Sequence, residues 1–461
     1  MTLSHRPPRL VVETREIEHV DDLLAYASPG EPLAWLRRGD GIVGIGSVAG
    51  YERGPQGAPG SDPADPGSPD ADSAARGTAA PGAIDAAAPG AAWRRIAETA
   101  EVDDPLRLPG TGLVGFGTLV FDPRSAGTSR LVVPRAVIGR HRGRSWITRI
   151  RLMAGDASAE ARAADAAAQD IAPAPYGPYW SATLGPGTLN PAGYQAAVRR
   201  AVDAILAGDL EKVVLARDLV GTIPAGADLR RLVRALADDY PDTWTFAVDG
   251  LIGASPETLV TASRGVVTAR VLAGTIPRGT DAHDDAGASS SLAHSVKDLD
   301  EHRYAVQSVL ATLGPHVRHL RADPEPFTLK LPNLWHLATD VAGDLADHAS
   351  ALDLVAALHP TAAVAGTPTD AALDLIRRLE PFDRGRYAGP VGWIDGDGNG
   401  EWAIALRCAQ IGTAAPGARA GDGDTIPVVA HAGAGIVAQS NPDKELLETR
   451  VKFRPIVDAL A

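Results

Sequence analysis

The sequence is poor in cysteine, methionine and aromatic residues, and it contains no long apolar run. Cys408 is the only cysteine among 461 residues, so the chain can form no internal disulfide bond and no cysteine-based metal cage. No stretch approaches the roughly 18–20 apolar residues that cross a bilayer, and residues 1–8 contain no apolar segment typical of a secretion signal. These absences predict a cytoplasmic protein without a membrane span.

Positive charge is also scarce. The 44 Lys and Arg residues are outnumbered by 57 Asp and Glu residues, which gives a net charge of -13, and there is no long basic run. Nucleic-acid binding requires a clustered basic surface, so we expect no nucleic-acid partner. Hydrophobic residues make up 45% and charged residues 22% of the chain, which is typical of a globular protein with one large or two ordinary domains.

Three segments lack the apolar residues of a folded core. Residues 54–92 are almost entirely Gly, Pro, Ala, Asp and Ser, with Ile84 as the single large apolar residue. Such a segment cannot bury enough surface to offset its ordering entropy, so we predict a disordered insertion. Residues 155–175 are rich in alanine and are compatible with a helix, and residues 413–426 are predicted to form the loop at the tip of a hairpin.

The remaining chain alternates between strand and helix patterns. The first 150 residues are mostly strand-like, a helix is predicted over residues 191–206, and a strand follows from Lys212 to Leu219. A C-terminal helix is predicted over residues 441–460, with Ser440 or Asn441 as its cap. The pattern is α+β, with a strand-rich part in residues 1–185 and a catalytic part in residues 186–461.

Two pairs of carboxylates have members three residues apart on predicted helices. Asp298 and Glu301 follow Ser295, and Glu445 and Glu448 lie in the C-terminal helix. This spacing places both members of a pair on one helical face, and two such faces would hold Mg²⁺ through one carboxylate each. From spacing alone a structural role is favoured, because Ser295 and Asp298 fit a capping box and acidic residues in a first turn complement the helix dipole.

Two glycine- or aspartate-rich motifs carry no function. Residues 110–115 match G-x-G-x-x-G, but a strand-like run follows them where the dinucleotide fingerprint requires a helix. Residues 395–400 imitate the start of an EF-hand loop, but Leu406 stands where the loop requires a glutamate. They are predicted to form a hairpin turn.

A series of motifs follows in one order through the second half of the chain. They are EKVVLAR (211–217), SPE (255–257), LAGTIPRG (272–279), KDLDEH (297–302), LHPT (358–361), RGRYAGPVGW (384–393), EWAIALR (401–407), GAGIV (433–437) and ELLET (445–449). This ordered set resembles the chorismate-utilising enzymes. The resemblance implies a single intertwined α/β-sandwich rather than two separable domains, and the segment 54–92 is foreign to the family pattern.

The resemblance implies that Lys212 is a general base and Glu257 a general acid. Isochorismate formation adds water at C2 of the chorismate ring and expels the C4 hydroxyl, so it needs a base and an acid on opposite sides of the ring. Burial favours a neutral amine and a protonated carboxyl, which suits both roles. Taken alone, a lysine at a strand start and a glutamate after proline are typical of solvated surface positions.

The remaining site residues are also implied by the resemblance. Glu301 and Glu448 match direct ligands of Mg²⁺, and Asp298 and Glu445 match positions that assist them, although many relatives carry Glu in place of Asp298. Arg407 and Tyr387 would face the enolpyruvyl carboxylate, and Lys452 the ring carboxylate. The full substrate-binding set is Gly274, Thr275, His336, Thr361, Tyr387, Arg407, Gly435 and Lys452.

Two of these residues have ordinary alternatives. Lys452 is spaced to form an i,i+4 surface pair with Glu448. His336 alone would more often be a packed core histidine.

A lysine at position 212 resembles the family members that deliver water, not ammonia, to chorismate. The implied activity is isochorismate synthase, an isomerase of menaquinone or siderophore pathways. The alternative is salicylate synthase, which goes on to eliminate pyruvate. Anthranilate and aminodeoxychorismate synthases are disfavoured, since they lack this lysine and need a glutaminase. We therefore expect chorismate as substrate, Mg²⁺ as cofactor, no glutaminase subunit and a monomer.

Overall fold

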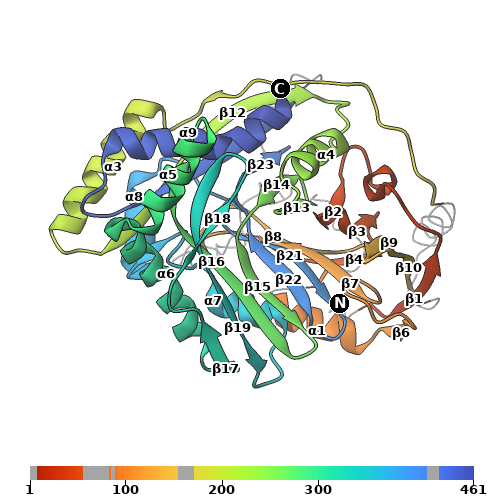
Figure 1. Ribbon diagram of the computed structural model, residues 1–461. Helices are drawn as coiled ribbons and strands as arrows, with labels where there is room; N and C mark the ends of the chain where they lie inside the picture. Colours follow the sequence, from red (N-terminus) through yellow and green to blue (C-terminus); the bar gives the residue numbers. More distant parts are fainter. Residues whose placement is uncertain (1–7, 55–82, 85–88, 154–170, 413–424) are drawn as a thin grey trace, which may run out of the picture.

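The computed structural model describes residues 8–54, 83–84, 89–153, 171–412 and 425–461. In these ranges the chain folds into two large, mostly antiparallel sheets that pack against one another. In Figure 1 the helices α3, α5, α6, α8 and α9 gather on one side of the molecule, and the N-terminal strands lie on the other.

Thirteen of the described strands form the first sheet. In spatial order they are β11 (Gly185–Pro186), β12 (Lys212–Pro224), β24 (Thr425–Ile436), β23 (Cys408–Ile411), β14 (Leu251–Ser255), β13 (Trp244–Val248), β2 (Leu33–Arg37), β3 (Asp40–Ile45), β9 (Ala136–His141), β10 (Arg144–Leu152), β1 (Leu10–Ile17) and β6 (Glu101–Asp103), with β20 (Gly366–Thr367) beside β12.

Eleven of the described strands form the second sheet. In spatial order they are β17 (Val317–Ala322), β19 (Leu334–Leu345), β16 (Val266–Pro277), β15 (Thr258–Ser263), β22 (Gly400–Ile404), β21 (Pro390–Asp395), β7 (Val114–Thr118), β8 (Ser129–Val133), β4 (Ala49–Arg53) and β5 (Ala83–Ile84), with β18 (Phe327–Lys330) beside β19.

The helices cover the outer faces and one end of the sandwich. They are η1 (Leu23–Tyr26), α1 (Pro89–Glu98), α3 (Pro191–Leu206), α4 (Arg230–Asp239), α5 (Ala282–Ala293), α6 (Val296–Leu313), α7 (Ala351–Leu358), α8 (Thr369–Leu379) and α9 (Pro442–Leu460).

Successive residues of a strand serve two separate apolar cores. In β2, Trp35 points into the core shared by the two sheets, whereas Leu36 points to the opposite face. That outer face is covered by α4 and by the C-terminal end of α9, through residues such as Leu236 and Phe453. Because side chains alternate along a strand, the first sheet is buried on both faces and its central strands are almost continuously apolar.

Strands from before and after residue 185 lie in both sheets. In the first sheet β2 pairs with β13, and in the second sheet β7 pairs with β21. The predicted α+β class is confirmed, and the chain is built as a single α/β-sandwich.

The predicted elements that flank the site are confirmed. The first helix runs over Pro191–Leu206 and is capped by Asn190, whose side chain accepts a hydrogen bond from Gly193 N. The strand that begins at Lys212 extends further than predicted, to Pro224. The C-terminal helix is capped by Asn441 and not by Ser440. The hairpin turn after Asp395 and the strand at Val114–Thr118 are also as predicted.

Two predictions of local structure need correction. Residues 55–82 and 85–88 of the predicted insertion lie outside the described residues, but α1 already begins at Pro89. Its buried Trp93 and Ile96 supply the apolar face that the Ala- and Gly-rich run lacks. Of the predicted alanine-rich helix, residues 155–170 lie outside the described ranges and residues 171–175 form no helix.

Candidate active site

A cavity of about 460 Å³ lies where β12, β16 and β24 meet helices α6 and α9. Strands of both sheets and two helices therefore contribute to one site. The predicted site residues that line it are Glu257, Gly274, Thr275, Asp298, Glu301, His336, Tyr387, Arg407, Gly435, Glu445, Glu448 and Lys452.

Lys212 lies behind this lining as the first residue of β12, and its side chain is 1% exposed. Its Nζ atom is 3.0 Å from Oε1 of Glu301, an ion pair whose angle does not satisfy hydrogen-bond geometry. A lysine is almost never this buried unless it is paired. The solvated edge position that a lone lysine would suggest is therefore not what the structure shows.

Glu257 lies in the turn between β14 and β15 and is 6% exposed. Ser255 fixes this turn, because its hydroxyl accepts a hydrogen bond from Glu257 N and donates one to Ile404 O at 2.6 Å. Burial raises the pKa of Glu257 to about 7, against the attraction of nearby cations, of which Lys212 contributes most. A substantial fraction of this carboxyl therefore carries its proton at neutral pH.

Four carboxylates from two helices line the cavity. Asp298 and Glu301 come from the start of α6, and Glu445 and Glu448 come from α9. Asp298 also takes part in the helix cap, since Ser295 accepts from its backbone N–H and donates to its carboxylate. Asp298 therefore takes part in the N-terminal cap of α6 and also lines the cavity.

Lys452 and Glu448 form the i,i+4 pair that their spacing predicts, but inside the cavity. The Nζ atom of Lys452 is 2.5 Å from Oε1 of Glu448 and also donates to Gly433 O at 3.0 Å. The lysine side chain is only 12% exposed. The pair is thus part of the site and not a surface salt bridge.

Arg407 marks the point where the chain crosses from β22 in the second sheet to β23 in the first. Its φ angle of 50° is in the left-handed region, which is unfavourable for a residue with a side chain. Such backbone strain is concentrated at functional sites. The side chain is 7% exposed and lines the cavity.

His336 connects Arg407 to the cavity wall. Its Nε2 is 3.4 Å from Nη2 of Arg407, and its Nδ1 is 3.0 Å from Oγ1 of Thr275. Burial holds the pKa of His336 well below its usual value, so the ring is neutral. Since a guanidinium can only donate, the hydrogen-bond pattern assigns the ring proton to Nδ1.

Two glycines allow the close approaches that the cavity requires. Gly435 in β24 has no side chain where a Cβ would collide with Oε1 of Glu301 and lie 3.1 Å from Cε of Lys212. Gly274 has a φ of +79° at an irregularity of β16, between Ala273 and Thr275. A side chain at position 435 would therefore displace the carboxylate of Glu301, and the backbone conformation at position 274 favours glycine.

Thr361 is the predicted substrate-binding residue that does not line the 460 Å³ cavity. It lines a separate small cavity together with Glu257 and Ala363. Its Oγ1 is buried and has no hydrogen-bond partner within the described ranges. Its position behind the Glu257 turn explains why it is close to the site without facing it.

No role was expected for His302, which lies behind the irregular stretch of β16 at Gly274. The ring is 2% exposed, with Nε2 2.8 Å from Thr339 Oγ1 and Nδ1 3.3 Å from Ala273 O. Burial lowers the pKa of His302 to about 4. His302 directly follows Glu301 in the chain, and no periodic pattern in a single sequence would indicate that it has a role of its own.

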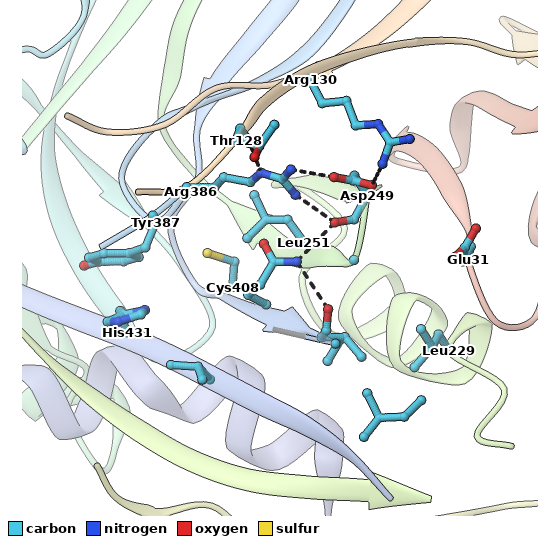
Figure 2. A pocket seen from close by; sticks show the side chains of 18 of the residues that line it. Glu31, Thr128, Arg130, Leu229, Asp249, Leu251, Arg386, Tyr387, Cys408 and His431 are labelled. Carbon is cyan, nitrogen blue, oxygen red and sulfur yellow. Dashed lines mark hydrogen bonds and ion pairs between the residues drawn. The ribbon is translucent and has the colours of Figure 1, made fainter. Parts of the chain in front are cut away.

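A second and larger cavity, of about 1160 Å³, opens on the other side of Tyr387 (Figure 2). Tyr387 lines both cavities, and in the larger one its ring stacks on His431 with 5.1 Å between centroids. Of the charged side chains labelled in Figure 2, Asp249 binds both Arg130 and Arg386, and Glu31 lies apart from them. The smaller cavity is lined by the predicted acid and the four carboxylates and is backed by the predicted base, and it is therefore the candidate active site.

Within the described part of the chain, no helix is long and apolar enough to cross a membrane.

The two-sheet sandwich, the cavity and the order of the motifs are those of a chorismate-utilising enzyme. The chain belongs to the family of chorismate binding enzymes, because the sequence model of that family matches residues 74–461.

Curated relatives and solved structures of this family narrow the comparison. The chain is 39% identical over 283 residues to isochorismate synthase DhbC of Bacillus subtilis, covering 59% of this chain and 68% of that protein. It is 40% identical over 300 residues to a putative isochorismate synthase MenF of Mycobacterium tuberculosis, covering 62% and 78%. The crystal structure of a putative 2,3-dihydroxybenzoate-specific isochorismate synthase DhbC of Bacillus anthracis superimposes with a TM-score of 0.68 at 27% identity, covering 95% and 98%.

Proposed function

We propose that this chain is an isochorismate synthase, an isomerase that converts chorismate to isochorismate. The observation that carries the proposal is a buried carboxyl, Glu257, in the lining of a cavity that also holds cations and carboxylates, with the buried amine of Lys212 directly behind that lining and 3.0 Å from Glu301. The relative with 39% identity is named as an isochorismate synthase, and the relative with 40% identity as a putative isochorismate synthase. The residues of the cavity and the names of these relatives therefore support the same substrate and the same reaction.

In the proposed reaction Lys212 takes a proton from the attacking water, and Glu257 gives a proton to the leaving C4 hydroxyl. The base must be a neutral amine when it acts, because only an unprotonated amine can accept the proton of water. The acid must hold its proton, and burial raises the pKa of Glu257 to about 7 for this purpose. The two groups thus have opposite tasks at the same pH.

The two carboxylates of chorismate require cationic partners. Arg407 and Lys452 line the cavity and supply them, with Tyr387 as a neutral hydroxyl donor because burial raises the pKa of its phenol. A guanidinium can bind a carboxylate through two parallel hydrogen bonds, which also fixes its orientation. We propose that Arg407 and Tyr387 bind the enolpyruvyl carboxylate and Lys452 the ring carboxylate.

The four cavity carboxylates are the type of donor that a hard divalent cation prefers. All are oxygen donors, and no cavity-lining cysteine accompanies them. Mg²⁺ commonly uses one or two protein carboxylates, with waters and substrate oxygens as the other ligands. We propose Glu301 and Glu448 as the Mg²⁺ ligands, assisted by Asp298 and Glu445. When bound, the ion would neutralise substrate carboxylate charge and orient the ring.

Because the nucleophile is water, the proposed reaction needs no ammonia and no glutaminase subunit. We also propose that the chain acts as a monomer, which light scattering of the purified protein would test. A dimer peak that persists on dilution would contradict this part of the proposal.

The test of the proposed chemistry follows the oxygen atom. Conversion of chorismate in ¹⁸O-water should place one ¹⁸O atom in the isochorismate formed, because the new C2 hydroxyl comes from water. Mass spectrometry of the product detects the heavier oxygen. Isochorismate without the label would show that the hydroxyl migrates within the substrate, and Lys212 would then not be the base that activates water.

A further inference from the structure

The strand that carries Lys212 has one edge that no other described strand covers completely. Along its opposite edge β12 pairs with β24 over its whole length from Val213. On the uncovered side β20 pairs only with Lys212 and Val213, and β11 only with Leu219 and Val220. The backbone groups between these two short partners are buried and must find other hydrogen-bond partners.

Two charged side chains complete this edge. The carboxylate of Glu380 accepts a hydrogen bond from Ala216 N at 2.7 Å, and Nη2 of Arg384 donates to Val214 O at 2.8 Å. Glu380 and Arg384 also bind each other through two parallel hydrogen bonds of 2.8 and 2.5 Å. Their side chains are 1% and 3% exposed.

The same guanidinium reaches the turn that follows α7. Nη1 of Arg384 donates to Val364 O at 3.0 Å, and Val364 N in turn bonds to Thr361 O. The backbone oxygen of Arg384 accepts from Tyr387 N at 3.0 Å. Arg384 therefore joins the three segments that carry Lys212, Thr361 and Tyr387, and it lines the candidate active site.

The planar face of the guanidinium is also fixed. It lies over the ring of Phe121, with 4.4 Å from Cζ to the ring centroid. Its orientation is thus set by a carboxylate, two carbonyl groups and a ring. Lysine offers no planar fork and would not reproduce this geometry.

We propose that Arg384, held by Glu380, is a positioning residue that sets the place of Lys212 relative to the substrate. The inference rests on the proposed function, since it assigns Lys212 as the base. Val214 and Ala216 share a strand face with Lys212, so a shift of this edge moves the amine directly. Arg384 itself touches no reacting atom in this account.

If Arg384 only stabilised the fold, a variant that regains stability should also regain activity. A matched single and double variant can separate that role from the positioning of Lys212. Arg384→Met alone leaves the Glu380 charge buried without its partner, which destabilises the fold. The double variant Glu380→Gln/Arg384→Met removes both charges, and the amide oxygen of the introduced glutamine can still accept from Ala216 N. We expect the double variant to keep a Tm close to that of the wild type, because no uncompensated buried charge remains.

The decisive readout is whether activity returns with stability. We expect kcat of the double variant to stay about 100-fold below wild type, the usual cost of a small displacement of a reacting group, with little change in KM. The kcat of Arg384→Lys should lie between that of the methionine variants and that of the wild type. Arg386→Met is the control, because Arg386 pairs with Asp249 in the other cavity, and it should turn over like the wild type. A double variant with wild-type Tm and wild-type kcat would overturn the proposal.

A second readout does not depend on turnover. Methyl acetimidate labels lysine amines, and mass spectrometry can follow Lys212 and the exposed Lys330 in one experiment. In the double variant the labelling rate of Lys212 should rise while that of Lys330 stays constant. An unchanged Lys212 rate would contradict the positioning role. A wild-type protein that leaves chorismate unchanged would refute the proposed function, and the labelling result would still decide whether Arg384 positions Lys212.

Discussion

The amine of Lys212 lies 3.0 Å from a carboxylate oxygen of Glu301, so the proposed base touches a proposed metal ligand. A similar contact joins Lys452 to Glu448 at 2.5 Å on the facing helix. Each helix therefore brings to the cavity one carboxylate that is balanced by a lysine. Because these contacts are buried, their electrostatic interactions are screened less than those of surface pairs, and a change at one member should affect its partner.

Replacement of Lys212 by alanine should abolish most of the isochorismate formation. Loss of a general base costs about 10²–10⁴-fold in rate, and chorismate consumption followed by HPLC measures it. The matched control is Lys444→Ala, since Lys444 is an exposed residue at the rim of the same cavity. A Lys212→Ala protein that folds and keeps near-normal turnover with water would show that another group is the base.

Replacement of Glu257 by glutamine should remove the acid and change the pH profile. The acid must be protonated to act, so kcat/KM of the wild type should fall as the pH rises through about 7. In Glu257→Gln the rate should be lower by about 10²–10⁴-fold, and this decline should disappear. A wild-type profile with no decline near pH 7 would contradict the role of Glu257.

The same substitution should stabilise the protein at high pH. The folded-state pKa of Glu257 is about 7, above the ordinary value of 4.5, so the folded state binds more protons between these values. The free energy of unfolding should fall over this range by roughly 3 kcal/mol and stay constant above it. Urea unfolding of Glu257→Gln should therefore show a higher stability than wild type at about pH 8 and a similar one at about pH 4. Equal stabilities at the higher pH would mean that the carboxyl is not buried as described.

Replacement of Glu448 by glutamine should weaken Mg²⁺ binding. A lost carboxylate ligand should raise the Mg²⁺ concentration for half-maximal activity by at least about 10–100-fold, and isothermal titration calorimetry without substrate should show the same loss of affinity. Asp443→Asn is the control, because Asp443 is an exposed acidic residue of the same helix. An unchanged Mg²⁺ affinity in Glu448→Gln would place the metal elsewhere.

Replacement of Gly435 by alanine should disrupt the Lys212–Glu301 contact. The added methyl group would occupy the space of Oε1 of Glu301, so we expect a loss of at least about 10²-fold in kcat, as for other displaced catalytic groups. Gly287→Ala is the control, since a Cβ at Gly287 in α5 meets no other atom within 4 Å, and it should stabilise the helix by about 1 kcal/mol. Normal activity of Gly435→Ala would show that the contact is not needed.

The parts of the site that depend on local sequence could be predicted well. The strand at Lys212 and the helices that carry the four carboxylates follow from apolar periodicity and from capping residues such as Ser295 and Asn441. The residues around the cavity were implied by the order of motifs, which reflects a shared fold. Their roles as base, acid and ligands remain predictions.

The long-range relationships could not be predicted from a single sequence. Arg384 and Glu380 complete the edge of a strand that lies 164 or more residues earlier in the chain, and no periodic pattern encodes such a contact. The start of α1 was missed because its apolar face depends on Trp93 and Ile96, just beyond the Gly- and Ala-rich run. Thr361 was expected at the substrate because the motif gives its neighbours but not the direction of its side chain.

The most direct test of the central claim is HPLC analysis of the products after incubation with chorismate and Mg²⁺, with and without ammonium. We expect isochorismate at equilibrium with chorismate, formed at the same rate in both conditions. Salicylate with pyruvate, formed faster than in the absence of protein, would identify a salicylate synthase instead. An aromatic amine that forms only with ammonium would contradict the assignment of Lys212 as the base that activates water.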